Sequence, residues 1–293
     1  MSDVPARRGP SPALLLAIVA ISTGAPFARW AAPTSPLVIA ALRPAIAALL
    51  LLAAGHRELA SLRRIPARDR RYVVLSGLML GVHFGSWIAS LSFTSTAASV
   101  ALVCTNPIFA AAFGTLLGDR VTRRELGGIA IAAAGCAVLA GGDWSAGGPA
   151  LIGDGLALVG AASGAAYLVL GRRLRATLPL LPYLGTVNAI AATGLGIAAL
   201  IAWRIDPHFI APDGHALLAC ACAALVASFI GHSLLNAAVR VTPTHLVALA
   251  VLGEPIGSSL ITWAAFGEQP PIHAVIGGAI VLVGIAIGFV RRS

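Results

Sequence analysis

Glu254 and Arg43 are ionisable residues that stand inside long apolar stretches of the chain. A charge near the middle of a bilayer costs about 2.5–3.5 kcal/mol on insertion scales, so such a residue must be paired, hydrated or neutral. Glu254, directly before Pro255, is therefore a candidate for proton coupling or for binding a substrate amine, with Arg43 as its candidate partner. The alternative is structural: Glu254 would bind backbone N–H groups of a broken neighbouring helix, and Arg43 would serve helix packing near the interface.

Polar and aromatic side chains recur at helical spacing in four apolar segments. The four stripes are Ser76, His83, Trp87, Ser90 and Thr94; Ser163 and Tyr167; Ser228, His232 and Asn236; and Glu254, Ser258 and Thr262. Polar groups that face lipid would go unsatisfied, so we expect the stripes to face one another around a substrate path near mid-membrane. The plainer interpretation is that the hydroxyls bind their own helix backbone or pack neighbouring helices.

The candidate substrate-binding residues are therefore His83, Trp87, Ser90, Ser163, Tyr167, His232, Asn236 and Glu254. Trp87 and Tyr167 lie deeper in their segments than interfacial aromatics do, so they could stack an aromatic or apolar substrate, although core packing explains them equally well.

Other chemistries find weaker signals. Ser228 and His232 are four residues apart, which suggests a hydrolase dyad, but same-helix spacing rarely aligns a nucleophile with its base. The four cysteines fall inside apolar segments, and Cys220 and Cys222 point to different helix faces, so no metal site or disulfide is predicted. No G-x4-G-K-[ST] loop occurs. We therefore predict no enzyme and no cofactor.

Composition places these residues in a membrane protein. Hydrophobic residues make up 58% of the 293 residues and charged residues 11%, against roughly a quarter charged in soluble domains. The mean hydropathy is +0.90. The apolar stretches are long enough for helices that cross a bilayer, and they do not alternate as barrel strands do. We predict an all-α membrane protein of ten helices, at 12–31, 36–54, 72–94, 97–118, 125–142, 150–170, 182–202, 216–239, 244–266 and 272–290.

A pattern stated twice divides the chain into two halves, 1–145 and 146–293, of five spans each. His83 returns as His232 and Asn106-Pro107 as Glu254-Pro255. Gly118-Asp119 returns as Gly267-Glu268, and Gly127-Gly128…Gly135 as Gly277-Gly278…Gly284. Because five is odd, the second half must enter the membrane from the opposite side, as in the inverted repeats of secondary transporters.

Pro107 and Pro255 occupy equivalent places in the two halves, and each removes a backbone hydrogen bond inside a span. We hypothesise that they are hinges that bend alternately, with a fixed kink as the alternative.

Arginine distribution predicts the orientation. All 20 basic residues are arginine, and 17 of them fall on one side of the predicted spans; Arg29 and Arg204 fall on the other, and Arg43 within a span. Positive charge marks the cytoplasmic face, so both termini should be cytoplasmic. The net charge of +9 then reflects topology and attraction to anionic lipid, with no nucleic-acid partner. All-arginine usage indicates a GC-rich bacterium and hence its inner membrane. A monomer is plausible, and the oligomeric state stays open.

The repeat resembles the ten-helix branch of the drug/metabolite transporter superfamily, whose members carry two EamA-type repeats. The matching stretches are Ala97-Ala98-Ser99 through Thr105-Asn106-Pro107 with Gly118-Asp119, Gly253-Glu254-Pro255 through Gly267-Glu268, and Leu42-Arg43. His83…Trp87 and the chain length are most similar to bacterial exporters of aromatic and other amino acids. The resemblance implies a secondary transporter that exports small metabolites, amino acids above all. A passive facilitator or channel and an intramembrane Ser/His hydrolase are the alternatives.

Overall fold

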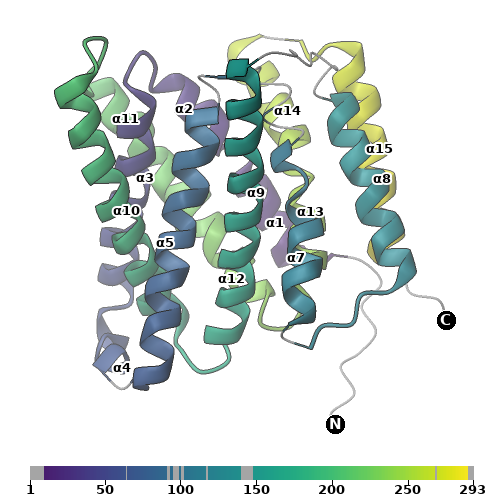
Figure 1. Cartoon of the computed structure of the whole chain (residues 1–293), viewed down its shortest axis with the longest axis horizontal. Coiled ribbons are helices and arrows are strands. Elements are labelled where there is room, and N and C mark those ends of the chain that lie inside the picture. Colours follow the sequence, from purple (N-terminus) through teal and green to yellow (C-terminus); the bar gives the residue numbers. More distant parts are fainter. Residues whose placement is uncertain are drawn as a thin grey trace.

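The protein is a bundle of helices (Figure 1). The computed structural model describes residues 10–63, 65–90, 93–94, 99, 102–116, 118–139, 148–267 and 269–289. Within these ranges every regular element is a helix, which confirms the all-α prediction. The quoted residues Ala97, Ala98 and Glu268 lie outside the described part of the chain.

The helices follow one another with short connections. They are α1 (Pro12–Ile21), α2 (Gly24–Trp30), α3 (Pro36–Ala54), the 3₁₀ turn η1 (His56–Glu58), α4 (Ala60–Arg63), α5 (Ala67–Ser90), α7 (Asn106–Thr115), α8 (Arg123–Leu139), α9 (Gly148–Leu174), α10 (Leu180–Ile205), α11 (Gly214–Ala223), the π-helix η2 (Ala224–His232), α12 (Ser233–Ala238), α13 (Thr244–Val251), α14 (Glu254–Phe266) and α15 (Ile272–Phe289).

Eight described helical segments are long and apolar enough to cross a membrane. Eight of the predicted spans correspond to these segments. The predicted spans 97–118 and 125–142 overlap α7 and α8, whose described lengths are 10 and 17 residues. The count of ten therefore stays a prediction.

Helix ends follow from local sequence signals. Ser11 caps α1, because its Oγ accepts a hydrogen bond from Leu14 N (3.2 Å), and Pro12 follows where its missing N–H has no consequence. Thr122 and Glu125 form a reciprocal capping box before α8. Gly118 and Gly267 have φ of 86° and 72° and follow α7 and α14, so the two equivalent glycines adopt the left-handed conformation that ends helices.

Several spans are interrupted where the sequence predicts continuous helices. α1 gives way to α2 around Ser22, and a turn at 252–253 separates α13 from α14. Pro107 and Pro255 each stand in the first turn of a new helix, directly after a turn. The predicted kink inside a helix is therefore a break, because a proline at a helix start needs no hydrogen-bond partner for its nitrogen. In the eighth span the break takes another form, the nine-residue π-helix η2.

The bundle is assembled from closely packed helix pairs: α8 with α15, α3 with α10, and α5 with α9. α8 and α15 lie side by side at one edge of the bundle (Figure 1). They touch through glycines: a Cβ added at Gly128 would lie 2.7 Å from the Gly284 carbonyl oxygen and 2.8 Å from Gly288 N. Small residues allow this backbone contact, which replaces the hydrophobic driving force that lipid does not supply.

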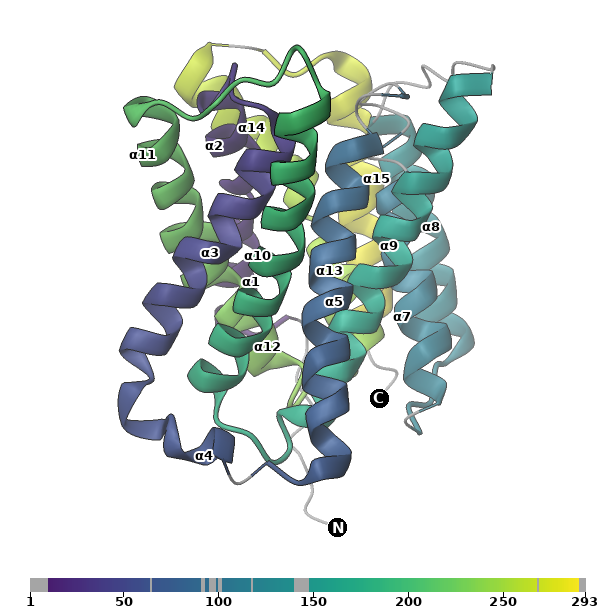
Figure 2. The ribbon, with the colours of Figure 1, turned by 60° about the vertical axis from the view of Figure 1, so that its left-hand side comes forward.

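Described arginines gather at the end of the bundle where α4 lies (Figures 1 and 2). The Arg173 guanidinium lies 4.1 Å from the Tyr72 ring centroid, and Arg172 pairs with Asp119, so the starts of α5 and α8 and the end of α9 meet there. Arg29 and Arg204 belong to the opposite end, where Ser35 Oγ accepts a hydrogen bond from Ile210 N (2.7 Å). We call the first of these the arginine-rich end.

The α8–α15 contact leads to a test with a matched control. Gly128→Ala should lower the free energy of unfolding by about 1–3 kcal/mol, because the new methyl group would push two backbones apart. Gly127→Ala, one residue away, meets nothing within 4 Å and should leave stability unchanged or slightly raised. Thermal unfolding in detergent micelles measures both. Equal unfolding temperatures for the two variants would show that the contact is not tight.

Candidate functional site

Arg43, on α3, is held by two side chains of the π-helix η2. Its Nε donates to Ser228 Oγ at 2.8 Å, and its Nη2 lies 3.3 Å from His232 Nε2. A guanidinium has no acceptor, so the His232 Nε2 must accept and a neutral His232 ring carries its proton on Nδ1. The interrupted span thus supplies the hydrogen-bond partners of the guanidinium inside the apolar bundle.

Phe84, on α5, supports the face of the same guanidinium. The Arg43 Cζ lies 4.8 Å from the centroid of the Phe84 ring, within the range of a cation–π interaction. Phe84 also lies between the two repeat-related histidines, with ring centroids 5.3 Å from His83 and 5.9 Å from His232. One aromatic ring therefore connects three residues that the sequence analysis singled out.

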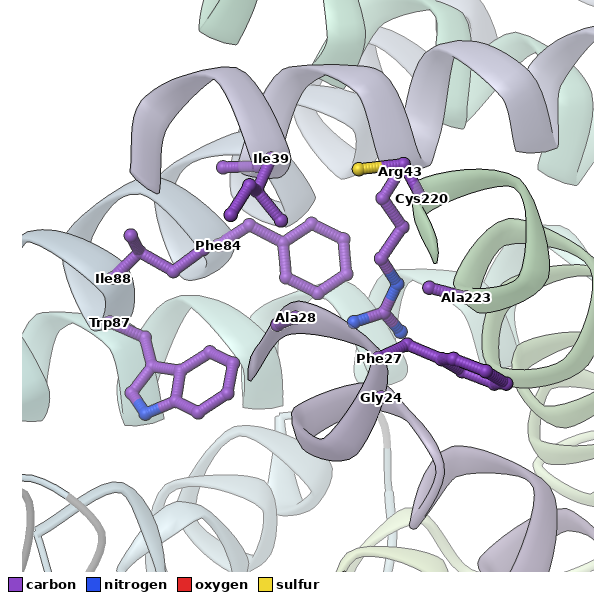
Figure 3. Close-up of a pocket in the computed structure, with 11 residues that line it drawn as sticks. Gly24, Phe27, Ala28, Ile39, Arg43, Phe84, Trp87, Ile88, Cys220 and Ala223 are labelled. Carbon is purple, nitrogen blue, oxygen red and sulfur yellow. The ribbon is translucent and has the colours of Figure 1, made fainter. Parts of the chain in front are cut away.

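A cavity of about 430 Å³, continuous in part with the outside, opens beside Arg43 (Figure 3). Besides Arg43 and Phe84, its lining comes from Gly24, Phe27, Ala28, Ile39, Ala40, Trp87, Ile88, Cys220 and Ala223. Figure 3 shows the Arg43 guanidinium and the Phe84 and Trp87 rings directed into the same space. Helices α2 and α11, which form much of the wall, lie toward the end opposite α4 (Figure 2). The cavity therefore belongs to the half of the bundle away from the arginine-rich end.

His83 and His232, equivalent in the repeat, have different partners. His83 Nδ1 lies 2.8 Å from the carbonyl oxygen of Gly160, and Asn106 Nδ2 donates to the neighbouring Ala161 carbonyl at 2.8 Å. Both residues therefore bind the backbone of α9, and Gly164 leaves them room, since a Cβ there would lie 2.8 Å from His83 Nδ1. His83 stands behind Phe84 from the cavity, whereas His232 binds Arg43.

Several other candidates are satisfied within the helix packing. Tyr167 Oη accepts a hydrogen bond from Asn236 Nδ2 at 2.7 Å, and both residues are buried. Ser163 Oγ donates to the Val159 carbonyl of its own helix, as the plainer interpretation expects. Ser90 Oγ bonds Ser99 Oγ at 2.6 Å. Of the candidate substrate-binding residues, Trp87 lines the cavity and His232 touches it through Arg43.

Glu254 is the first residue of α14 and is partly exposed. Its backbone oxygen accepts a hydrogen bond from Ser22 Oγ at 3.3 Å, at the break between α1 and α2, and Ser258 Oγ donates to the Ser22 carbonyl at 2.8 Å. Its carboxylate interacts electrostatically with Arg43, but the described residues include no direct salt bridge between the two. No residue of α14 is buried, so the stripe of Glu254, Ser258 and Thr262 borders a loosely packed region.

The arginine-rich end is closed by ionic contacts between the two halves. Asp119, after α7, pairs with Arg172 at the end of α9, and the Asp119 side chain is only 6% exposed. Glu125 Oε2 of α8 lies 3.5 Å from Nε2 of His245, which is fully buried near the start of α13. The sequence analysis did not single out these pairs, because partners from separate spans leave no local spacing signal.

Phe84 and the apolar cavity residues also escaped the sequence analysis. Phe84 follows His83, so it projects about 100° away from the polar stripe that drew attention to its helix. Phe27, Ile39 and Ile88 are ordinary apolar residues within apolar spans, and nothing in the sequence separates them from lipid-facing neighbours.

Comparison with known proteins assigns the site to a family. The model of the EamA-like transporter family matches residues 11–141 and 151–290. The chain belongs to this family. A search of curated proteins found no match. A solved structure described only as "Crystal structure of protein" is similar with a TM-score of 0.77 and 20% sequence identity, over 94% of both chains, which shows a shared fold.

Family membership identifies the protein as a multi-pass membrane transporter of small solutes with a two-repeat architecture. Members of the family are transporters and not enzymes. The predicted drug/metabolite transporter resemblance is thus confirmed at the level of the family.

Proposed function

We propose that this EamA-like transporter is a secondary exporter of amino acids and similar small metabolites, with aromatic and other apolar amino acids favoured. The observation that carries the proposal is Arg43, held by the interrupted helix η2 beside a cavity with aromatic walls. A buried cation next to Phe84 and Trp87 can bind a carboxylate while the rings hold an apolar side chain.

Helix pairing supports an inverted repeat. α3 and α10 are the second spans of their halves and pack together, as do the last spans, α8 and α15. The contact of α5 with α9 has a counterpart in the contact of η2 with α1 when the halves are exchanged. The matching positive φ values of Gly118 and Gly267 support the same relation. Two equivalent halves provide two interchangeable gates, which is the basis of alternating access.

The structure's asymmetry fits one state of that cycle. The cavity lies away from the arginine-rich end, and contacts of Asp119 with Arg172 and of Glu125 with His245 join the halves at that end. An exporter loaded from the cytoplasm must break these contacts to open there. Pro107 and Pro255, at helix breaks, are proposed as the hinges of this movement.

Glu254 is the proposed coupling residue, with Arg43 as its electrostatic partner. It lies at the α13–α14 break near the loosely packed α14, where a proton could reach it from the cavity side. The alternative hydrolase has no supporting contact, because Ser228 and His232 each bind Arg43 and the described hydrogen bonds do not join them to each other.

A counterflow assay tests the transporter proposal. Liposomes loaded with an excess of unlabelled amino acid should transiently accumulate labelled amino acid from outside, because an alternating-access carrier exchanges the two. Arg43→Gln should lower this exchange on the order of tenfold or more by removing a charged hydrogen-bond donor. Arg204→Lys, at an exposed site, should match the wild type. Label that equilibrates without overshoot would indicate a channel or facilitator, and a panel with nucleotide sugars, polyamines and cationic drugs defines the substrate class.

Pro255→Ala tests the hinge. Alanine restores an N–H group that can bond back across the 252–253 turn and straighten the span, so the exchange rate should fall while insertion and yield stay unchanged. Pro36→Ala, the same change at the uninterrupted start of α3, is the control and should have no effect. Wild-type exchange by Pro255→Ala would rule out the hinge.

Orientation in the bacterial inner membrane, with both termini cytoplasmic, is part of the proposal and follows from the arginine-rich end. Green fluorescent protein fused after the last residue should fluoresce, since it folds in the cytoplasm. Alkaline phosphatase inserted between α10 and α11 should be active, since that connection lies at the opposite end. The reverse pair of results would contradict the orientation.

A further inference from the structure

Arg43 has one nitrogen left over for a ligand. Nε bonds Ser228 and Nη2 contacts His232, whereas Nη1 has no hydrogen-bond partner among the described residues. Nη1 lies against Gly24 of α2, where a Cβ would come within 3.3 Å of it. Gly24 and Arg43 both line the cavity, so the free N–H groups are available from that side.

The cavity has a positive charge with no anion opposite it. Of the described residues that line the cavity, Arg43 is the charged one, and no aspartate or glutamate is among them. Glu254 acts on Arg43 electrostatically but does not form a salt bridge with it. Burying a cation without a directly bound anion is unfavourable, so an anionic ligand would complete this site.

The remaining walls are suited to an apolar group. Phe27, Ile39 and Ile88 surround the space, and the Trp87 ring faces it from α5 (Figure 3). Phe84 covers one face of the guanidinium, so an anion must approach Arg43 along its edge, toward Nη1. An anion bound there would leave its apolar part among these side chains.

We infer that the cavity binds an amphipathic carboxylate through Arg43, and that an ammonium group on the same molecule contributes nothing to binding. The inference rests on the proposed function and sharpens it: the recognised features of an amino acid are its carboxylate and its apolar side chain. Deaminated analogues such as aryl propionates belong to the same ligand class, and amines that lack a carboxylate do not.

Four probes dissect the ligand on the wild-type protein in lipid nanodiscs, with binding measured by titration calorimetry. Phenylalanine carries both charged groups, 3-phenylpropionate the carboxylate alone, phenethylamine the ammonium alone, and acetate a carboxylate without the ring. Phenylalanine and 3-phenylpropionate should bind with similar affinity. Phenethylamine should not bind, and acetate should bind at least about tenfold more weakly than 3-phenylpropionate because it buries no ring.

Two variants assign the two halves of the ligand. Arg43→Gln should weaken 3-phenylpropionate binding on the order of tenfold to a hundredfold, since a charged hydrogen bond is lost. Trp87→Ala should weaken 3-phenylpropionate but leave the weak acetate binding unchanged. Unfolding temperatures of both variants serve as the folding control, and the wild-type series decides the matter if a variant does not fold.

Binding of phenethylamine in preference to 3-phenylpropionate would overturn the inference, as would binding of none of the four or equal binding of acetate and 3-phenylpropionate. Counterflow keeps the two proposals separate. Exchange of other solutes with no carboxylate requirement would retain the transporter and reject this ligand class. Arg43-dependent binding of 3-phenylpropionate without any counterflow would retain the site and reject the proposed transport mechanism.

Discussion

A guanidinium inside an apolar bundle must be surrounded by groups that replace water, and this constraint organises the centre of the protein. Arg43 receives an acceptor from Ser228, a second from His232 and an aromatic face from Phe84. These partners come from two different spans, so the charge ties α3 to α5 and η2. The π-helix matters here because a widened turn changes which side chains face Arg43 from that span.

Interrupted helices serve the same need. A continuous transmembrane helix uses nearly all its backbone groups internally, whereas a break leaves carbonyls and N–H groups available. Ser22 marks such a break, and its carbonyl and hydroxyl connect to Ser258 and to the backbone of Glu254 across the α13–α14 break. The two discontinuous spans are thus joined at their discontinuities. Away from the centre, the glycine contact of α8 with α15 is a uniform, close-packed interface that contains no charge.

The two ends of the bundle differ in how firmly they are held. At the arginine-rich end, buried or nearly buried partners link the first half to the second through Asp119, Arg172, Glu125 and His245. At the other end α14 has no buried residue, and the cavity reaches Arg43 from that side. Ion pairs in a low-dielectric setting are strong while formed but cost desolvation, so they suit contacts that form in one state and separate in another.

The amino-acid sequence alone determined the helical class, most of the spans, the two-repeat pattern and the family, because long apolar runs and repeated glycines and prolines are local signals. It also drew attention to Arg43, His232 and Trp87, which the structure brings to one site. Tertiary structure decided the rest. Ser163 turned to its own backbone, Tyr167 and Asn236 paired with each other, and His83 bound α9. Phe84, Phe27 and the ionic contacts of the arginine-rich end became visible only in three dimensions. The physical reason is that helical spacing specifies which side chains share a face, whereas their partners depend on how separate helices approach, rotate and break.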